Sequence, residues 1–290
     1  MKGLILAGGT ATRLYPATLA ANKQLLPVYD KPMIYYPLSV LMLAGIQEIS
    51  VITTPGHLSL FKNLLGDGSK WGLRLDYIAQ DRPRGVAHAL VLGRDFVGSD
   101  RVALILGDNL FYGHGLSDDL GEAAGRQNGA TIFAHYVSDP NRYGVIKFDN
   151  EERAVDIVEK PAETLSHWAV TGLYFYDNTV FDFATALRPS ARGEMEITDV
   201  NRWYLQSGRL HVKKFGRGYA WLDTGTHDDL LDASEFVRTI QRRQGLLVGC
   251  PEEVAFLKGF IGPDRLLALA RNYDKSPYGR YLEQLVAKAE

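Results

Sequence analysis

The sequence predicts an α/β protein with an open, mostly parallel sheet. Short apolar runs, each long enough for one strand, alternate with longer helical stretches through the first half of the 290 residues. The runs are apolar throughout and end at turn residues, which is typical of strands buried on both faces of a parallel sheet. Hydrophobic residues make up 46% of the chain and charged residues 23%, so we expect a sizeable core rather than global disorder.

The first half of the chain is expected to run β-α-β-α-β. Strands are predicted at residues 4–7, 49–53, 75–79 and 102–106. Residues 32–45, between the first two strands, are apolar all round, with proline near the start and glycine at the end. This pattern indicates a buried crossover helix.

The middle of the chain is richer in strands, which are predicted at residues 131–134, 145–148, 155–158 and 169–176. The second and third of these flank the polar residues 150–153, which indicates a hairpin.

The tail is expected to be helical. Thr226 and Asp229 have capping-box spacing and predict a helix that runs to Gly245, and Ser276-Pro277 opens a last helix. We therefore predict an α/β core over residues 1–225 and a helical extension over residues 226–290. Two weakly separated domains are the alternative.

Charge and composition exclude several classes of protein. The net charge of −2 gives no basic field for nucleic acid or an anionic membrane. The longest uncharged stretch, residues 32–47, is too short for a transmembrane helix, and the N-terminus reaches glycine too soon for a signal peptide. The lone Cys250 excludes an intramolecular disulfide and a cysteine-based metal site. We expect a cytoplasmic protein.

Residues 8–14, Gly-Gly-Thr-Ala-Thr-Arg-Leu, follow the first predicted strand directly. Ligands bind at the carboxyl ends of strands in open α/β sheets, and glycines allow backbone N–H groups to surround a phosphate. Arg13 adds a fixed charge to the same turn. The loop is neither a Walker A motif nor Gly-x-Gly-x-x-Gly, which argues against a dinucleotide-binding oxidoreductase. A tight turn with a surface arginine is the alternative.

Other candidate residues follow later strands. Asp108 and Asp223 could share one Mg²⁺, which takes one or two carboxylates plus substrate oxygens, although a strand-end aspartate more often caps a turn. Glu159 and Lys160 offer an acceptor for sugar hydroxyls and a cation for phosphate, or simply an exposed ion pair. The seven histidines have no metal-ligand spacing, and no Ser/His/Asp triad is readable.

Longer stretches carry a family resemblance over nearly the whole chain. They are residues 3–9, 23–38, 65–68, 106–109, 142–145, 159–161, 169–177, 196–201, 218–226, 243–246 and 250–253. In these stretches the chain resembles the short-type bacterial glucose-1-phosphate thymidylyltransferases of the sugar nucleotidyltransferase superfamily. The resemblance implies a Rossmann-like nucleotidyltransferase core with a helical C-terminal part. It also implies Mg²⁺ as cofactor and a homotetramer built from dimers.

The implied reaction joins dTTP and α-glucose 1-phosphate into dTDP-glucose and pyrophosphate. By resemblance, the nucleotide is bound by Leu6, Gly8, Gly9, Thr10, Ala11, Thr12, Arg13, Gln24, Gln80, Pro83, Gly85 and Asp108. The sugar phosphate is bound by Asn109, Tyr143, Gly144, Glu159, Lys160 and Val170. Asp108 and Asp223 bind the metal, and the catalytic set is Arg13, Lys23, Asp108, Lys160 and Asp223. A phosphomonoester, with a second pKa of about 6, is already ionised at neutral pH, so no general base is required.

The chain departs from the family pattern within the substrate pockets. Ala11 replaces the third glycine of the family loop, at a cost of about 1 kcal/mol if that position needs a positive φ. Arg84 and His88 replace the usual Asp and Gln, and His167-Trp168 replaces Asn-Tyr. Two alternatives therefore stay open. One is a relative that uses UTP or another hexose 1-phosphate, and the other is a non-catalytic regulatory paralogue.

Overall fold

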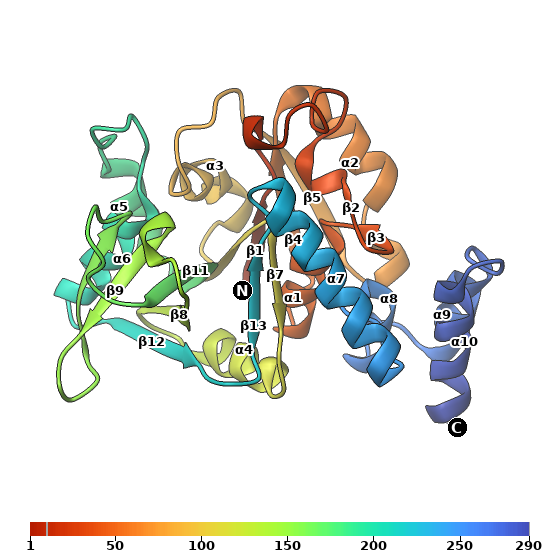
Figure 1. Cartoon of the computed structure of the whole chain (residues 1–290). Coiled ribbons are helices and arrows are strands. Elements are labelled where there is room, and N and C mark those ends of the chain that lie inside the picture. Colours follow the sequence, from red (N-terminus) through yellow and green to blue (C-terminus); the bar gives the residue numbers. More distant parts are fainter. Residues whose placement is uncertain (10, 290) are drawn as a thin grey trace.

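The computed structural model describes residues 1–9 and 11–289 (Figure 1). Its centre is a mixed sheet of nine strands. These are β1 (Lys2–Leu6), β4 (Glu48–Thr53), β5 (Arg74–Ala79), β6 (Val102–Leu106), β8 (Ala130–Tyr136), β9 (Gly144–Phe148), β10 (Ala154–Glu159), β11 (Trp168–Tyr176) and β12 (Leu210–Phe215). Two small sheets pair β2 (Pro27–Val28) with β3 (Lys31–Pro32) and β7 (Asn109–Tyr112) with β13 (Ala220–Asp223).

Helices cover both faces of this sheet. They are α1 (Tyr35–Leu43), α2 (Leu58–Leu65), α3 (His88–Val97), α4 (Leu116–Gly125), α5 (Val180–Ala186), α6 (Ile197–Gln206), α7 (His227–Gln244), α8 (Pro251–Leu257), α9 (Pro263–Arg271) and α10 (Pro277–Ala289). None of these helices is both long and apolar enough to cross a membrane.

The first half of the sheet is parallel. Strand β1 lies between β4 and β6, and β5 adds to the far side of β4, all in the same direction. The register places Leu6 beside both Ile52 and Leu106, so the carboxyl ends of three strands meet at one edge. The loop after β1 and Asp108 after β6 are thereby brought together.

The middle of the chain forms the antiparallel half. Strand β11 pairs antiparallel with β6 and β8, and β9 and β10 form the predicted hairpin. Strand β12 returns parallel to β8. Figure 1 shows these strands with α5 and α6 on the left of the molecule.

Burial explains why the strands could be predicted. Adjacent residues of β1 belong to different cores: Ile5 packs with α1, α2, α4 and α8–α10, whereas Leu4 packs with α3, α5 and α6. A strand covered on both faces must be apolar throughout. A third cluster joins Ala233 and Val237 of α7 to the two small sheets.

The predicted α/β class and mixed sheet are confirmed, with some differences. The crossover helix begins at Tyr35 rather than at residue 32, because Lys31 and Pro32 pair as β3 with β2. The strands β7, β12 and β13 were not predicted. Strand β12 reads Leu-His-Val-Lys-Lys-Phe, whose charged residues hide the short apolar alternation.

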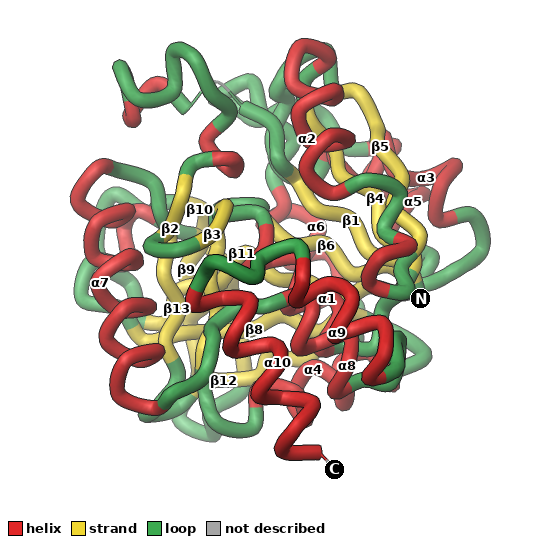
Figure 2. The backbone as a smooth tube through the Cα atoms, turned by 90° about the vertical axis from the view of Figure 1, so that its right-hand side faces the viewer, coloured by secondary structure: helices red, strands yellow, loops and turns green. Residues whose placement is uncertain are grey.

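The helical tail is confirmed, including the capping box of Thr226 and Asp229 and the end of α7 at Gly245. Helices α8 and α9 were not predicted individually. Figure 2 shows α8, α9 and α10 gathered beside α1, whereas α7 runs along β2, β3 and β13. The division at residue 225 falls between β13 and α7 and stays a prediction.

Candidate active site

A cavity of about 410 Å³ opens where the two halves of the sheet meet. Most of the predicted site residues line it, namely Gly8, Ala11, Thr12, Arg13, Lys23, Gln24, Asp108, Asn109, Tyr143, Gly144, Glu159, Lys160, Val170 and Asp223. The lining does not include Leu6, Gly9, Gln80, Pro83 or Gly85. Thr10 lies outside the described residues.

The glycine loop, residues 8–14 without Thr10, follows β1 and ends in the short 3₁₀ turn Thr12–Leu14. Only Leu14 is anchored in the core, at 1% exposure, while Thr12 and Arg13 are exposed. Ala11 has φ +45° and ψ +38°, in the left-handed region, so this position does have a positive φ. An L-residue there is strained by about 1 kcal/mol.

Gln80 lies directly behind the loop rather than in the cavity wall. A Cβ at Gly8 would lie 2.5 Å from Gln80 Oε1, so glycine is required for this close approach. The Gln80 amide also pairs with His88 Nδ1 at 3.2 Å. Burial, and secondarily the charge of Arg84, lowers the pKa of His88, which favours its neutral form. Arg84 and His88, two of the departures from the family pattern, therefore both influence the orientation of Gln80.

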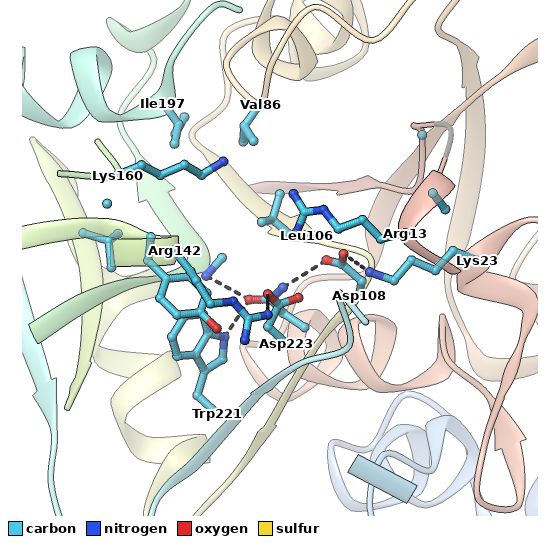
Figure 3. Close-up of a pocket in the computed structure, with 18 of the residues that line it drawn as sticks. Arg13, Lys23, Val86, Leu106, Asp108, Arg142, Lys160, Ile197, Trp221 and Asp223 are labelled. Carbon is cyan, nitrogen blue, oxygen red and sulfur yellow. Dashed lines mark hydrogen bonds and ion pairs between the residues drawn. The ribbon is translucent and has the colours of Figure 1, made fainter. Parts of the chain in front are cut away.

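The carboxylate frame consists of Asp108, Asn109, Asp223 and Thr224. The pairing of β7 with β13 sets Asp223 opposite Asn109, and the Thr224 hydroxyl donates to the Asp108 carbonyl at 3.0 Å. Asp108 and Asp223, distant in sequence, are brought to neighbouring positions by this pairing (Figure 3).

Asn109 connects the frame to the main sheet. Its Oδ1 accepts from the Gly172 backbone at 3.0 Å and from the Trp221 indole at 2.6 Å. Its Nδ2 donates to Asp108 Oδ1 at 3.0 Å. Asn109 is 2% exposed, so the structure shows it orienting Asp108 in addition to lining the cavity.

Asp223 lies in an environment that disfavours its ionised form. Burial and the neighbouring charge of Asp108 raise the pKa of Asp223 to about 6, although Lys23 and Arg142 oppose the shift. Lys23 Nζ pairs with Asp108 Oδ2 at 2.6 Å.

Arg13 and Lys160 extend into the cavity from opposite sides (Figure 3). Neither pairs with a carboxylate of the described residues, in contrast to Lys23. Lys160 has a positive φ of +42° and its N–H donates to the Tyr143 carbonyl at 3.0 Å, which fixes the backbone below its side chain. Two cations are therefore available for anionic groups of a ligand.

Glu159 does not pair with Lys160, so the alternative of a simple Glu159–Lys160 ion pair is wrong. Glu159 accepts from Arg192 at 3.3 Å and from the Thr198 hydroxyl at 2.5 Å instead. These bonds hold the carboxylate in place beside Gly144, whose added Cβ would lie 3.3 Å from Glu159 Oε2.

Several lining residues were not predicted as site residues. They are Leu14, Val86, Leu106, Arg142, Gly172, Tyr174, Ile197, Trp221 and Gly225. Trp221 packs against Tyr143 with ring centroids 4.9 Å apart and forms an aromatic wall. Arg142 and Trp221 fall within the stretches that carry the family resemblance, but only the fold shows that they face the cavity.

His167 and Trp168 are not part of the cavity lining. His167 stacks on the exposed Tyr136 at 5.2 Å, and Trp168 packs against Phe148 at 6.2 Å. This departure from the family pattern lies where the chain enters β11, outside the cavity lining.

The carboxylate pair fits a divalent cation that takes its other ligands from substrate and water. Both donors are carboxylates, and a cation between them would offset the burial and the repulsion from Asp108 that together raise the pKa of Asp223. Within residues 1–9 and 11–289, no cluster supplies three His, Cys, Asp or Glu side chains to one ion. The pair therefore suits a divalent cation that also binds substrate oxygens, rather than one held in a closed protein cage.

Comparisons with known proteins agree with this geometry. A family model described as nucleotidyl transferase matches residues 2–240. A glucose-1-phosphate thymidylyltransferase of Xanthomonas campestris is 57% identical over 99% of this chain and 97% of its own length. One from Neisseria meningitidis is 55% identical over 99% of this chain and its full length.

A solved structure gives the same result. A Bacillus anthracis protein assigned as a glucose-1-phosphate thymidylyltransferase, crystallised with sucrose, aligns with a TM-score of 0.77 at 44% identity. The alignment covers 82% of this chain and 95% of that one. The resemblance drawn from the sequence is thereby confirmed.

Proposed function

The chain belongs to the nucleotidyl transferase family, and on that premise we propose that it is a glucose-1-phosphate thymidylyltransferase. It joins dTTP and α-glucose 1-phosphate into dTDP-glucose and releases pyrophosphate. The reaction requires two polyanions to approach each other, so the main task of the protein is to neutralise charge and fix geometry.

The observation that carries this proposal is the arrangement of charges around one cavity. Arg13 and Lys160 are unpaired by any described carboxylate and reach in from opposite sides, and the Asp108–Asp223 pair lies between them (Figure 3). Cations on two sides fit two phosphate-bearing substrates, whereas a carboxylate pair alone would repel them.

The nucleophile is a phosphate oxygen of the sugar phosphate, which is mostly doubly ionised at neutral pH because its second pKa is about 6. No side chain has to remove a proton. Arg13 neutralises the departing pyrophosphate, and Lys160 holds the attacking phosphate in line with the α-phosphorus. Lys23 stays beside Asp108, where it orients the carboxylate and adds positive charge near the nucleotide.

Asp108 and Asp223 would hold the cation, which we propose is Mg²⁺. When bound, it neutralises phosphate oxygens and orients the triphosphate. Asn109 and the β7–β13 pairing keep the two carboxylates in position before any cation arrives.

The sugar lies on the antiparallel side of the cavity in this proposal. Glu159, held by Thr198 and Arg192, accepts from sugar hydroxyls. Tyr143, Gly144 and Val170 form the adjoining wall. Gln80, Pro83 and Gly85, outside the cavity lining, are the residues proposed to surround the base, and Gln80 lies against Gly8.

The test is pyrophosphate release measured with purified protein and Mg²⁺ across a panel of nucleotides and hexose 1-phosphates. We expect the highest kcat/KM for dTTP with glucose 1-phosphate. A strong preference for UTP would favour the relative with altered specificity, and the Gln80–His88 contact would then be the structural feature to substitute first. No release with any pair would favour a non-catalytic paralogue.

The homotetramer implied by the family resemblance and the cytoplasmic location expected from the sequence also remain proposals. Light scattering of the purified protein measures the first directly. A monomeric mass at assay concentrations would show that the cavity acts without a partner copy.

A further inference from the structure

Arg142 connects the carboxylate frame to the start of α7. Its Nη2 donates to Asp229 Oδ2 at 2.7 Å and its Nη1 to Oδ1 at 3.4 Å, a two-point contact. The same Nη2 lies 3.9 Å from Asp223 Oδ2. One guanidinium thus lies between a carboxylate of the proposed cation site and a carboxylate that caps a helix.

Asp229 is held firmly enough to anchor this arginine. Its Oδ2 also accepts from the Thr226 N–H at 3.0 Å, and its own N–H donates to the Thr226 hydroxyl at 3.2 Å. This reciprocal capping box fixes the Asp229 side chain, which in turn fixes the guanidinium. The turn between β13 and α7 is tight, because a Cβ at Gly225 would lie 3.3 Å from Asp223 Oδ2 and 3.6 Å from Arg142 Nη2.

The charges at this end of the cavity are nearly balanced without any bound ligand. Three carboxylates, Asp108, Asp223 and Asp229, face two cations, Lys23 and Arg142. A divalent cation that enters alone must compete with both cations for the same oxygens. A cation that enters with a triphosphate brings compensating negative charge.

We propose that Arg142 is a positioning and charge-balancing residue that keeps the nucleotide-free Asp108–Asp223 pair from binding a divalent cation tightly. The cation consequently enters the site together with the triphosphate. This inference rests on the proposed function, because it assumes that the carboxylate pair is the cation site.

The arrangement predicts opposite effects for the two partners of the salt bridge. Arg142→Gln removes a positive charge beside Asp223 and leaves Asp229 unbalanced, so the cation binds more tightly. In Asp229→Asn, Asp223 is the remaining carboxylate partner of Arg142, so more of the positive charge acts on the cation site and the cation binds more weakly. Arg142→Lys keeps the charge and therefore keeps the wild-type affinity, although it loses the two-point geometry.

The experiment titrates Mn²⁺ into the full chain without nucleotide and follows water-proton relaxation, which reports protein-bound Mn²⁺. We expect Arg142→Gln to bind Mn²⁺ about tenfold more tightly than wild type, from the loss of one nearby unit charge. Asp229→Asn should bind no more tightly than wild type. The matched control is Arg153→Gln, an exposed arginine paired with Asp149 and Glu151 in the β9–β10 turn.

Identical titrations of wild type and Arg142→Gln, including no binding by either, would overturn the inference. So would tighter binding by Asp229→Asn. If Arg142 only supported α7, both Arg142 variants would lower the melting temperature and leave Mn²⁺ affinity unchanged. Failure of the proposed function is distinguishable, because wild type would then release no pyrophosphate with any substrate pair whatever its Mn²⁺ affinity.

Discussion

The glycine loop and the carboxylate frame line the same cavity but are held in opposite ways. The loop depends on the buried Leu14 and a few backbone hydrogen bonds, and Arg13, the side chain proposed to meet the pyrophosphate, is exposed. The frame is fixed by strand pairing and by the three hydrogen bonds of Asn109. Groups that meet a bound phosphate can adjust to it, whereas cation ligands need a preset geometry.

We expect the largest effect on activity from a substitution in the glycine loop. Arg13→Ala should reduce kcat/KM by about 3–4 kcal/mol of transition-state stabilisation, roughly 100- to 1000-fold, because it removes the charge proposed to neutralise the departing pyrophosphate. The melting temperature should hardly change, since Arg13 is exposed. Steady-state pyrophosphate release and thermal melting measure the two effects.

Arg94→Ala is the control, since Arg94 is a surface arginine paired with Asp182 and lies outside the cavity lining. It should keep both activity and stability. Near-normal turnover of Arg13→Ala would remove the loop from the catalytic account.

A substitution in the carboxylate frame should mainly lower the free energy of unfolding. Asn109→Ala leaves the buried Trp221 indole and Gly172 N–H without an acceptor, and we expect a loss of about 3 kcal/mol in the free energy of unfolding. Activity should fall as well, because Asp108 Oδ1 loses the hydrogen bond from Asn109. Urea unfolding measures the first quantity.

The exposed Asn150→Ala should stay within about 0.5 kcal/mol of wild type. If Asn109→Ala unfolded at the same urea concentration as this control, the contrast between a rigid frame and a loosely held loop would be contradicted.

A methyl group at Gly8 tests the contact between the glycine loop and Gln80, a residue proposed to lie beside the nucleotide base. Gly8→Ala places a Cβ 2.5 Å from Gln80 Oε1, and we expect about 1–2 kcal/mol of destabilisation together with a raised KM for the nucleotide. Gly216→Ala is the matched control, because a Cβ there meets no heavy atom within 4 Å. Equal KM values for both variants would show that Gln80 has no influence on nucleotide binding.

The smallest effect comes from the strained position within the loop. Ala11→Gly relieves a left-handed alanine, but glycine also has more freedom in the unfolded chain, so we expect a net gain of only about 0.5 kcal/mol. Ala20→Gly, at an exposed position without positive φ, should bring no gain. A loss of stability in Ala11→Gly would mean that the loop uses the alanine methyl group.

Much of the fold could be predicted because its strands are buried on both faces. The apolar run of β6 and the capping box of Thr226 are local signals, and both were found. Strand β12 could not be found in this way, since its two lysines interrupt the apolar pattern.

The site could be predicted in part for the same reason. Asp108 follows a strand and therefore stands out, but its approach to Asp223 depends on the pairing of β7 with β13. Glu159 pairs with Arg192 from the loop between α5 and α6, and Arg142 pairs with Asp229 from the start of α7. No local pattern indicates which opposite charge each will meet.

The central claim is that a sugar phosphate attacks the α-phosphorus of dTTP in this cavity. The most direct test incubates the protein, Mg²⁺ and glucose 1-phosphate with dTTP labelled at either the α- or the γ-phosphorus. The account predicts that the α label appears in dTDP-glucose and the γ label in pyrophosphate. Transfer of the γ label to the sugar phosphate, or release of labelled inorganic phosphate alone, would contradict it.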